Sequence, residues 1–327
     1  MMTLTRRAAL LGGVAASALS ALGAAHAGAP AVGKQNAGFY RYKVGDIEIT
    51  VVTDGSNTFK FADNHVTNKT REELNKALEA AHQPKDLMTT PYNPIVVNTA
   101  GKLVVIDTGT GEAAYERSKG VTGQFQTNLK AAGIDRNAVD MVIISHFHGD
   151  HINGLITPEK KLAYPNAEIL VPAGDWKFFM DDGEMSRASG ERMKSVFKGV
   201  RDVFDPIGRK VTQYEPGKEL APGITSVATP GHTPGHTSHI IASGNSKVYV
   251  QADVTHVPWV NARHPEWHVF YDQDGAMAEA TRRKVYDMLV AEQMLVQGFH
   301  YPFPSLAYVE KSGDGYRETM VPWNPTI

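Results

Sequence analysis

The chain of 327 residues contains no cysteine, and neither sign of charge is in marked excess. The lack of cysteine excludes disulfides, iron–sulfur clusters, thiolate zinc sites and a cysteine nucleophile. The 33 lysines and arginines against 35 aspartates and glutamates leave a formal net charge of −2, which provides no basic field for nucleic acid or an anionic membrane surface. We therefore expect no nucleic-acid partner, and any metal must be held by histidine, carboxylate and water.

Residues 1–27 contain no apolar run long enough to span a membrane, but they have the three parts of a secretory signal. Arg6 and Arg7 precede a run of small and apolar residues that ends near Leu22, and Ala25-His26-Ala27 supplies a cleavage pattern. The run of about 15 weakly apolar residues is shorter than the roughly 20 that a bilayer requires. The paired arginines indicate the twin-arginine route. We predict a cleaved signal, a periplasmic or secreted protein, and no stable membrane insertion after processing.

Residues 28–327 are expected to form one domain, because no linker rich in Ser, Gly or Pro divides them. β-rich runs separated by turn residues predict hairpins over 39–53, where Asp54-Gly55 stops the second strand, and over 95–106. Capping-box spacing from Thr70 to Glu73 predicts that a helix starts there. Further patterns predict helices over 122–132 and 276–291, an amphipathic stretch over 174–198, and strands over 141–144, 167–171, 223–228, 239–242, 247–250 and 294–297.

Several of these strands are continuously apolar, which indicates burial on both faces. Two mixed sheets packed together with helices outside satisfy that requirement. We therefore predict an α/β fold of the αββα sandwich type.

The segment after strand 141–144 carries the most chemical information. His146, His148, Asp150 and His151 place three imidazoles and a carboxylate within six residues. A buried strand that ends in a glycine-containing loop puts alternate side chains on one side, so His146 and His148 can face one point. Crowded imidazoles are costly to protonate together unless a metal takes up their lone pairs. A polar loop with unconnected histidines is the alternative.

This segment resembles the His-x-His-x-Asp-His motif of the metallo-β-lactamase superfamily, which also follows a buried strand. The resemblance predicts further ligands after later strands. His232 follows strand 223–228, Asp253 follows the strand that ends at Val250, and His300 follows the strand that ends at Gln297. The likeness therefore covers nearly all of residues 39–310.

The resemblance implies two divalent metal ions, with Asp150 and Asp253 taking part in catalysis. The implied ligands are His146, His148 and His232 on the first ion, Asp150, His151 and His300 on the second, and Asp253 between the two. Imidazole and carboxylate suit zinc, our first choice, and also manganese, cobalt or iron. Two ions about 3.5 to 4 Å apart can share a hydroxide, which would be the nucleophile.

Differences from other branches of the family reduce the number of reactions that the resemblance allows. Members that reduce oxygen replace the second motif histidine with a carboxylate, whereas His148 stands here, so hydrolysis is favoured. The best-known β-lactamases use a cysteine and no bridging aspartate, whereas this chain has Asp253 and no cysteine. Branches that process nucleic acid carry an extra domain or a basic surface. The remaining relatives are lactonases, glyoxalase-II-like thiolesterases and methyl parathion hydrolase-like enzymes.

The methyl parathion hydrolase-like enzymes resemble this chain most. The likeness depends on the single-domain length and three segments: Tyr164-Pro165-Asn166-Ala167, the paired His232 and His236, and His300-Tyr301-Pro302-Phe303-Pro304. A glyoxalase II has a helical extension for its glutathione thioester, but only 27 residues follow His300. The resemblance therefore implies an exported dinuclear hydrolase that cleaves lactones, aryl esters or organophosphate triesters by attack of a metal-bridging hydroxide. A thiolesterase, a β-lactamase and a non-catalytic metal-binding protein are the alternatives.

Residues outside the ligand set receive weaker predictions. Asp107 follows a strand, as an acid that orients a ligand histidine does in the family, and an exposed turn is its alternative role. His236 either protonates the leaving group or supports its loop, and we favour support. Lactonases of the group use a tyrosine near the substrate oxygen, but no tyrosine is assigned here. Without one, substrates with good leaving groups are expected.

Aromatic residues between the ligand loops suit an apolar substrate pocket, with core packing or a dimer contact as the alternative. The pocket candidates are Trp176, Phe179, Phe197 and Trp259. Six further histidines carry no spacing signal and are assigned to surface or packing: His65, His82, His239, His256, His264 and His268. The family resemblance also implies a homodimer.

Overall fold

The computed structural model describes residue 33 and residues 35–327. The predicted signal, residues 1–27, lies outside the described residues. Residues Ala37–Ile327 form one compact unit. Within the described part of the chain, no helix combines the length and apolar character needed to cross a bilayer.

The first large sheet contains both predicted hairpins. Its strands lie in the order β1 (Phe39–Val44), β2 (Ile47–Val52), β5 (Ile95–Thr99), β6 (Lys102–Ile106), β7 (Met141–Ile143), β8 (Glu168–Pro172) and β9 (Thr212–Tyr214). The strands from β1 to β6 pair antiparallel, and those from β6 to β9 pair parallel. Gly45 allows the tight turn between β1 and β2, because its φ of 57° is unfavourable for residues with a Cβ.

The second large sheet has the same mixed character. Its strands follow chain order: β10 (Glu219–Ala221), β11 (Ile224–Ala228), β12 (Thr237–Ser243), β13 (Ser246–Ala252), β14 (Leu295–Gly298), β15 (Leu306–Ser312) and β16 (Gly315–Met320). Only β13 and β14 pair parallel in this sheet, and α10 (Gly275–Glu292) connects them. The carboxyl ends of these two strands therefore point the same way.

The two sheets pack face to face. Their shared core consists of apolar residues from both, including Val97 and Val104 of the first sheet and Ile241 and Val248 of the second, all with no exposed surface. A second core lies between the first sheet and its helices, and a third lies between the second sheet and α10. Apolar residues on both faces of each sheet explain the αββα sandwich, and the predicted fold class is confirmed.

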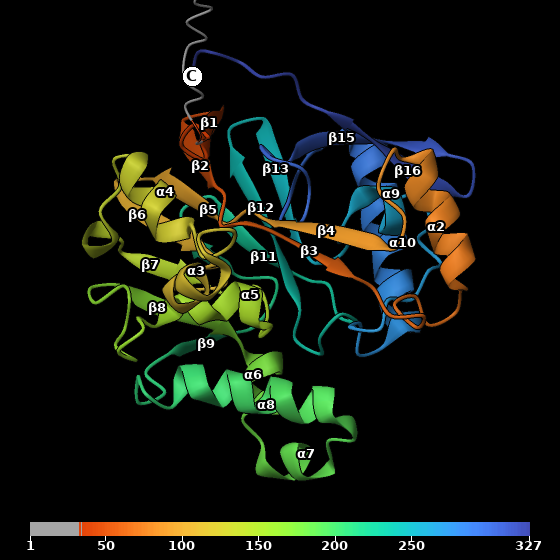
Figure 1. Ribbon diagram of the computed structural model, residues 1–327. Coiled ribbons are helices and arrows are strands. Elements are labelled where there is room, and N and C mark those ends of the chain that lie inside the picture. The colour runs from red at the N-terminus through yellow and green to blue at the C-terminus, as the bar shows by residue number, and fades with distance from the viewer. Residues whose placement is uncertain (1–32, 34) are drawn as a thin grey trace, which may run out of the picture. The chain divides into compact units, whose positions relative to one another are not determined.

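The remaining helices are short, apart from α8 (Gly190–Phe204). They are α2 (Arg71–Ala80), α3 (Glu112–Ser118), α4 (Phe125–Ala131), α5 (Gly149–Ile152), α6 (Ala173–Phe179), α7 (Asp182–Arg187) and α9 (Pro258–Asn261), with 3-10 turns η1 (Arg136–Ala138) and η2 (Asn153–Leu155). Thr70 and Glu73 form the predicted capping box of α2. In Figure 1, α6 lies next to β8 and β9, and α10 lies next to β15.

A third, two-stranded sheet was not predicted from the sequence. The opening hairpin stops before Asp54-Gly55, as expected, because β2 ends at Val52. Gly55 then begins β3 (Gly55–Lys60), which pairs antiparallel with β4 (Leu87–Tyr92). The buried Asp54 carboxylate accepts hydrogen bonds from the backbone N–H groups of Thr110 and Phe125, both at 2.8 Å. It therefore fixes the bend that directs β3 away from the first sheet.

Candidate metal centre

The seven predicted ligands come together in the structure from loops at the ends of four strands. His146 and His148 follow β7, and Asp150 and His151 lie in α5 directly after them. The other three follow strands of the second sheet: His232 lies after β11, Asp253 after β13 and His300 after β14.

His146, His148, His232 and Asp253 form the first cluster. Nδ1 of His148 lies 2.8 Å from Nε2 of His232 and 3.2 Å from Nε2 of His146. Oδ2 of Asp253 lies 3.2 Å from Nε2 of His232. Ring nitrogens that point at one another so closely, beside a buried carboxylate, match the donor set of a divalent cation.

The second cluster lies on the other side of Asp253 and contains Asp150, His151 and His300. Nε2 of His300 lies 3.5 Å from Oδ2 of Asp150 and 3.2 Å from Oδ2 of Asp253. Oδ1 of Asp253 lies 3.2 Å from Nε2 of His151. Asp253 thus contacts both clusters, and its buried Oδ1 has no hydrogen-bond partner among the described residues. The seven residues therefore fit two neighbouring divalent ions.

Burial and neighbouring charges favour the metal-binding forms of three of these side chains: His146, His148 and Asp253. Burial, reinforced by neighbouring imidazoles, lowers the pKa values of His146 and His148 well below the usual range, which leaves their lone pairs free. Burial alone would raise the pKa of Asp253, but the surrounding imidazoles outweigh it and hold that pKa well below its usual range. Asp253 is therefore a carboxylate even though it is only 3% exposed.

In three of the predicted ligand histidines, the ring nitrogen that faces away from the clusters donates a hydrogen bond. Nδ1 of His151 donates to Asp107 at 2.8 Å, and Nδ1 of His300 donates to the carbonyl of Pro91 at 2.7 Å. Nδ1 of His232 donates to Asp272 at 2.8 Å. Each bond fixes the tautomer and directs Nε2 toward the clusters. Asp107 thus lies against a ligand histidine rather than in an exposed turn.

His236 is bound to backbone on both sides. Its Nε2 accepts the backbone N–H of Asp253 at 3.0 Å, and its Nδ1 donates to the carbonyl of Thr229 at 3.0 Å. Burial and the nearby His232 lower the pKa of His236 to about 3. The ring therefore supports the Asp253 loop and has no nitrogen left for a leaving group.

Two buried acids that organise the site were missed by sequence reasoning. Asp272 also accepts a hydrogen bond at 3.2 Å from Arg282, whose guanidinium holds the carbonyl of Val254 at 3.0 Å. Asp175 links the segment after β7 to the segment after β11, because its carboxylate accepts hydrogen bonds from the backbone N–H groups of Phe147 at 2.8 Å and Gly235 at 2.6 Å. Neither acid stands at a diagnostic spacing, so the sequence offered no signal for them.

His256, which we assigned to surface or packing, is buried beside the two clusters. Its ring is 4% exposed, it lies at the cavity beside the clusters, and its Nε2 is 3.3 Å from Oδ2 of Asp253. Neither ring nitrogen has a hydrogen-bond partner among the described residues. The sequence feature that could have indicated a place at the site is its position three residues after the predicted ligand Asp253.

A cavity of about 260 Å³ opens over the clusters. Besides ligand residues and His256, its walls contain Thr90, Gly149, Arg192 and three aromatic rings: Phe59 of β3, Tyr92 of β4, and Tyr271. The cavity thus has the expected aromatic character, supplied by residues that sequence reasoning did not select.

The four residues selected for the pocket, Trp176, Phe179, Phe197 and Trp259, do not line this cavity. Phe179 and Phe197 are 0% and 1% exposed, within the core between the first sheet and its helices. Trp176 packs on that core, and Trp259 packs on the cluster around α2 and α9. The pocket assignment is therefore corrected, because these rings meet other side chains and not the cavity.

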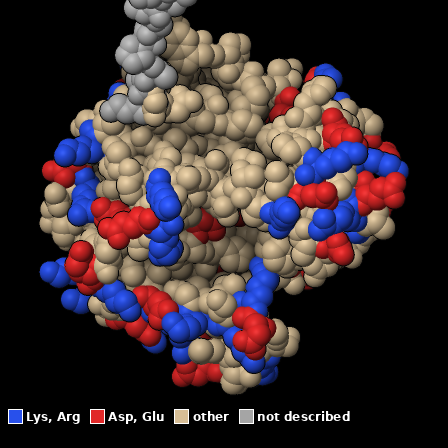
Figure 2. Space-filling view, in the orientation of Figure 1, with Lys and Arg blue, Asp and Glu red and all other residues tan. Residues whose placement is uncertain are grey.

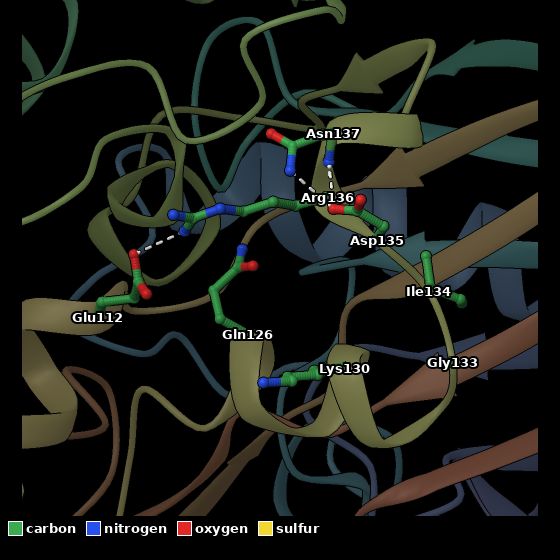
Figure 3. A pocket seen from close by; sticks show the side chains of 8 residues that line it. All are labelled: Glu112, Gln126, Lys130, Gly133, Ile134, Asp135, Arg136 and Asn137. Atoms are coloured by element: carbon green, nitrogen blue, oxygen red, sulfur yellow. Dashed lines mark hydrogen bonds and ion pairs between the residues drawn. The ribbon is translucent and has the colours of Figure 1, made fainter.

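A second cavity, of about 490 Å³, shares no lining residue with the clusters, and Figure 3 shows the residues that line it. Arg136 reaches across it to Glu112 at 3.0 Å, while Gln126 and Lys130 approach from α4. Its charged groups are partly paired and none belongs to the histidine clusters. Its greater volume therefore does not make it the candidate site.

Comparison with known proteins places the chain in a family. A model of the Metallo-beta-lactamase superfamily matches residues 88–262, more than half of the chain, and the chain belongs to this superfamily. Among curated proteins, an N-acyl homoserine lactonase from Bacillus sp is 25% identical over 178 residues, which are 50% of this chain and 63% of the lactonase. This chain thus covers less than two thirds of that relative's length.

Solved structures extend the similarity over most of the chain. AidC, a dizinc quorum-quenching lactonase solved with a product, has a TM-score of 0.81 and 27% identity, covering 88% of this chain and 98% of AidC. Hydrolase AbOPH has the same TM-score of 0.81 with 24% identity, covering 89% of this chain and all of AbOPH. The AbOPH match concerns the fold alone.

Proposed function

We propose that this chain is a dinuclear metal-dependent hydrolase of lactones, aryl esters or phosphotriesters. The observation that carries the proposal is the position of Asp253, whose buried carboxylate contacts His232 of the first cluster and both His151 and His300 of the second. Membership of the superfamily and the similarity to a dizinc lactonase support it. When bound, the two ions would activate water and polarise the carbonyl or phosphoryl oxygen of the substrate.

The protein's own residues would orient the substrate and handle the proton. Asp150 is the ligand carboxylate most open to the cavity, with 25% of its side chain exposed against 3% for Asp253, and we assign it the proton released during hydrolysis. Burial raises the pKa values of Tyr92 and Tyr271, so both phenols keep their protons and can donate hydrogen bonds to a substrate oxygen. The ring of Phe59 offers an apolar wall for an acyl or aryl group.

The test is metal analysis combined with a substrate panel. Purified protein loaded with zinc, manganese, cobalt or iron would be assayed with an N-acyl lactone, a p-nitrophenyl ester and methyl parathion. An S-acyl glutathione and a chromogenic cephalosporin represent the thiolesterase and β-lactamase alternatives. We expect chelator-sensitive turnover of at least one of the first three substrates. Turnover of only the thioester or the cephalosporin would refute the substrate assignment, and no turnover would favour a non-catalytic metal protein.

A further inference from the structure

Arg192 differs from the other basic residues of α8. Lys194, Lys198 and Arg201 each form an ion pair, with Glu191 at 3.2 Å, Asp202 at 2.5 Å and Asp182 at 2.6 Å respectively. Arg192 has no carboxylate partner among the described residues, and it alone of these four lines the cavity over the metal clusters. Its charge is therefore available to a ligand of that cavity.

Helix stability does not explain a cation at this position. Arg192 is the third residue of α8, where the positive end of the helix dipole disfavours a basic side chain. The guanidinium is nevertheless held at the cavity, because Nη2 donates to the carbonyl of Tyr271 at 3.3 Å and the group lies 5.2 Å from the ring of Phe270. These contacts use only part of its hydrogen-bonding capacity, since a guanidinium has five N–H donors.

The charge balance of the cavity favours an anion. Among the described residues, Asp150 and Asp253 are the only carboxylates in its lining, and two divalent ions would more than neutralise them. Arg192 adds a further positive charge at the same opening. A guanidinium binds a carboxylate through paired hydrogen bonds that a neutral group cannot match.

We propose that Arg192 is the anion-binding residue of the cavity and that the preferred substrates carry a carboxylate outside the scissile bond. This inference deepens the proposed function and rests on it. It makes Arg192 a determinant of specificity, because the scissile group would lie at the metal clusters while the distant carboxylate lies at α8.

The test compares acetoxybenzoates, with the carboxylate meta or para to the acetyl ester, with their methyl esters. The ratio of kcat/KM for acid over methyl ester cancels effects on the shared chemical step. We expect Arg192→Met to lower this ratio about tenfold for at least one isomer, the size expected for loss of a charge-assisted hydrogen bond. Lys194→Met, on the same helix but paired with Glu191, is the matched control and should leave the ratio unchanged.

An unchanged ratio in Arg192→Met, or an equal fall in Lys194→Met, would overturn the inference. Binding of benzoate to the metal-loaded protein gives a second readout that needs no turnover. Its Kd should rise about tenfold in Arg192→Met alone. If the wild type hydrolyses none of these esters or the other proposed substrates, the proposed function fails, and the benzoate affinities still decide the role of Arg192. Melting temperatures close to wild type would show that both variants fold.

Discussion

Asp253 is held by two local features that act on its backbone. The preceding Ala252 has a φ of 49°, in the left-handed region that residues with a Cβ rarely adopt. The N–H of Asp253 is bonded to the buried His236, which fixes the direction of the turn. Backbone strain of this kind is maintained only where the surroundings enforce it, and here it places one carboxylate between two clusters.

Replacement of Asp253 should therefore affect both clusters. We expect Asp253→Ala to lower chelator-sensitive turnover more than about a hundredfold, because the shared ligand is lost while the apolar cores remain. Metal content measured together with kcat/KM checks this. Asp46→Asn, in the exposed turn between β1 and β2, is the control. Near-normal turnover by fully metal-loaded Asp253→Ala would contradict the two-metal proposal.

Asp107 and Asp272 provide a matched pair of substitutions, since each holds the ring of a ligand in a different cluster. Asp107→Asn should lower the metal affinity of the cluster that contains His151 by about 10- to 100-fold. Asp272→Asn should lower that of the cluster that contains His232 by a similar factor. Titration calorimetry of the metal-free variants would resolve the two binding steps. Loss of the same step in both variants would argue against the division of ligands into two clusters.

At the scale of elements, the β3–β4 hairpin supplies the aromatic wall, whereas the helices on the first sheet provide core packing. Phe59→Ala should raise KM about fivefold for aryl esters with little change in stability, because its half-buried ring faces the cavity. Phe197→Ala should instead destabilise the protein by about 3–5 kcal/mol, because its ring is 1% exposed within a core. Michaelis constants and denaturant unfolding would separate the two effects, and the opposite pattern would restore the original pocket assignment.

Strand β12 contains a buried histidine that should make stability depend on pH. Burial lowers the pKa of His239 from 6.5 to about 4, and neither ring nitrogen has a hydrogen-bond partner among the described residues. The unfolded chain therefore binds more protons between these values, so stability is lost as the pH falls through that window.

His239→Leu should remove this contribution. When the pH is lowered from 7.5 to 5, the free energy of unfolding should fall by about 2 kcal/mol less in the variant than in the wild type. Urea unfolding at the two pH values, under identical metal loading, measures the difference. His82→Asn, a change at an exposed histidine, should retain the wild-type dependence. If the stability of His239→Leu depends on pH as strongly as that of the wild type, the buried His239 is not the cause of the pH dependence.

At the scale of the whole molecule, the candidate metal centre lies where segments that follow strands of both large sheets meet. Four of its ligands follow β7 of the first sheet, and three follow strands of the second. Acidic and basic side chains are interspersed on the face shown in Figure 2, as the near-zero net charge leads one to expect. The nature of the metal, the homodimer and the lack of a nucleic-acid partner stay predictions.

Metal binding should consequently stabilise the whole domain. Ions that bind only the folded protein add about 4 kcal/mol at a thousandfold excess over their Kd. We expect chelator treatment to lower the melting temperature and added zinc to restore it. Asp253→Ala should show a smaller response to zinc. Identical melting curves with and without zinc would indicate that the clusters do not hold it.

The sequence, together with the family resemblance, was sufficient to predict the sandwich, the two hairpins and the seven residues that cluster in the structure. These features follow from local patterns: apolar runs predict buried strands, and the motif from His146 to His151 is contiguous. His232, Asp253 and His300 were found because each follows a recognisable strand and the family resemblance fixes their order.

Tertiary structure alone decided what surrounds the ligands. Asp272 and Arg192 reach the site from segments that no spacing in the chain marks, and His256 has only its position three residues after Asp253 as a signal. The aromatic candidates failed for the same reason, since a phenylalanine in a core and one in a cavity wall have the same local pattern. Which of two apolar surfaces a ring meets depends on how distant elements pack, and sequence periodicity carries no information about that.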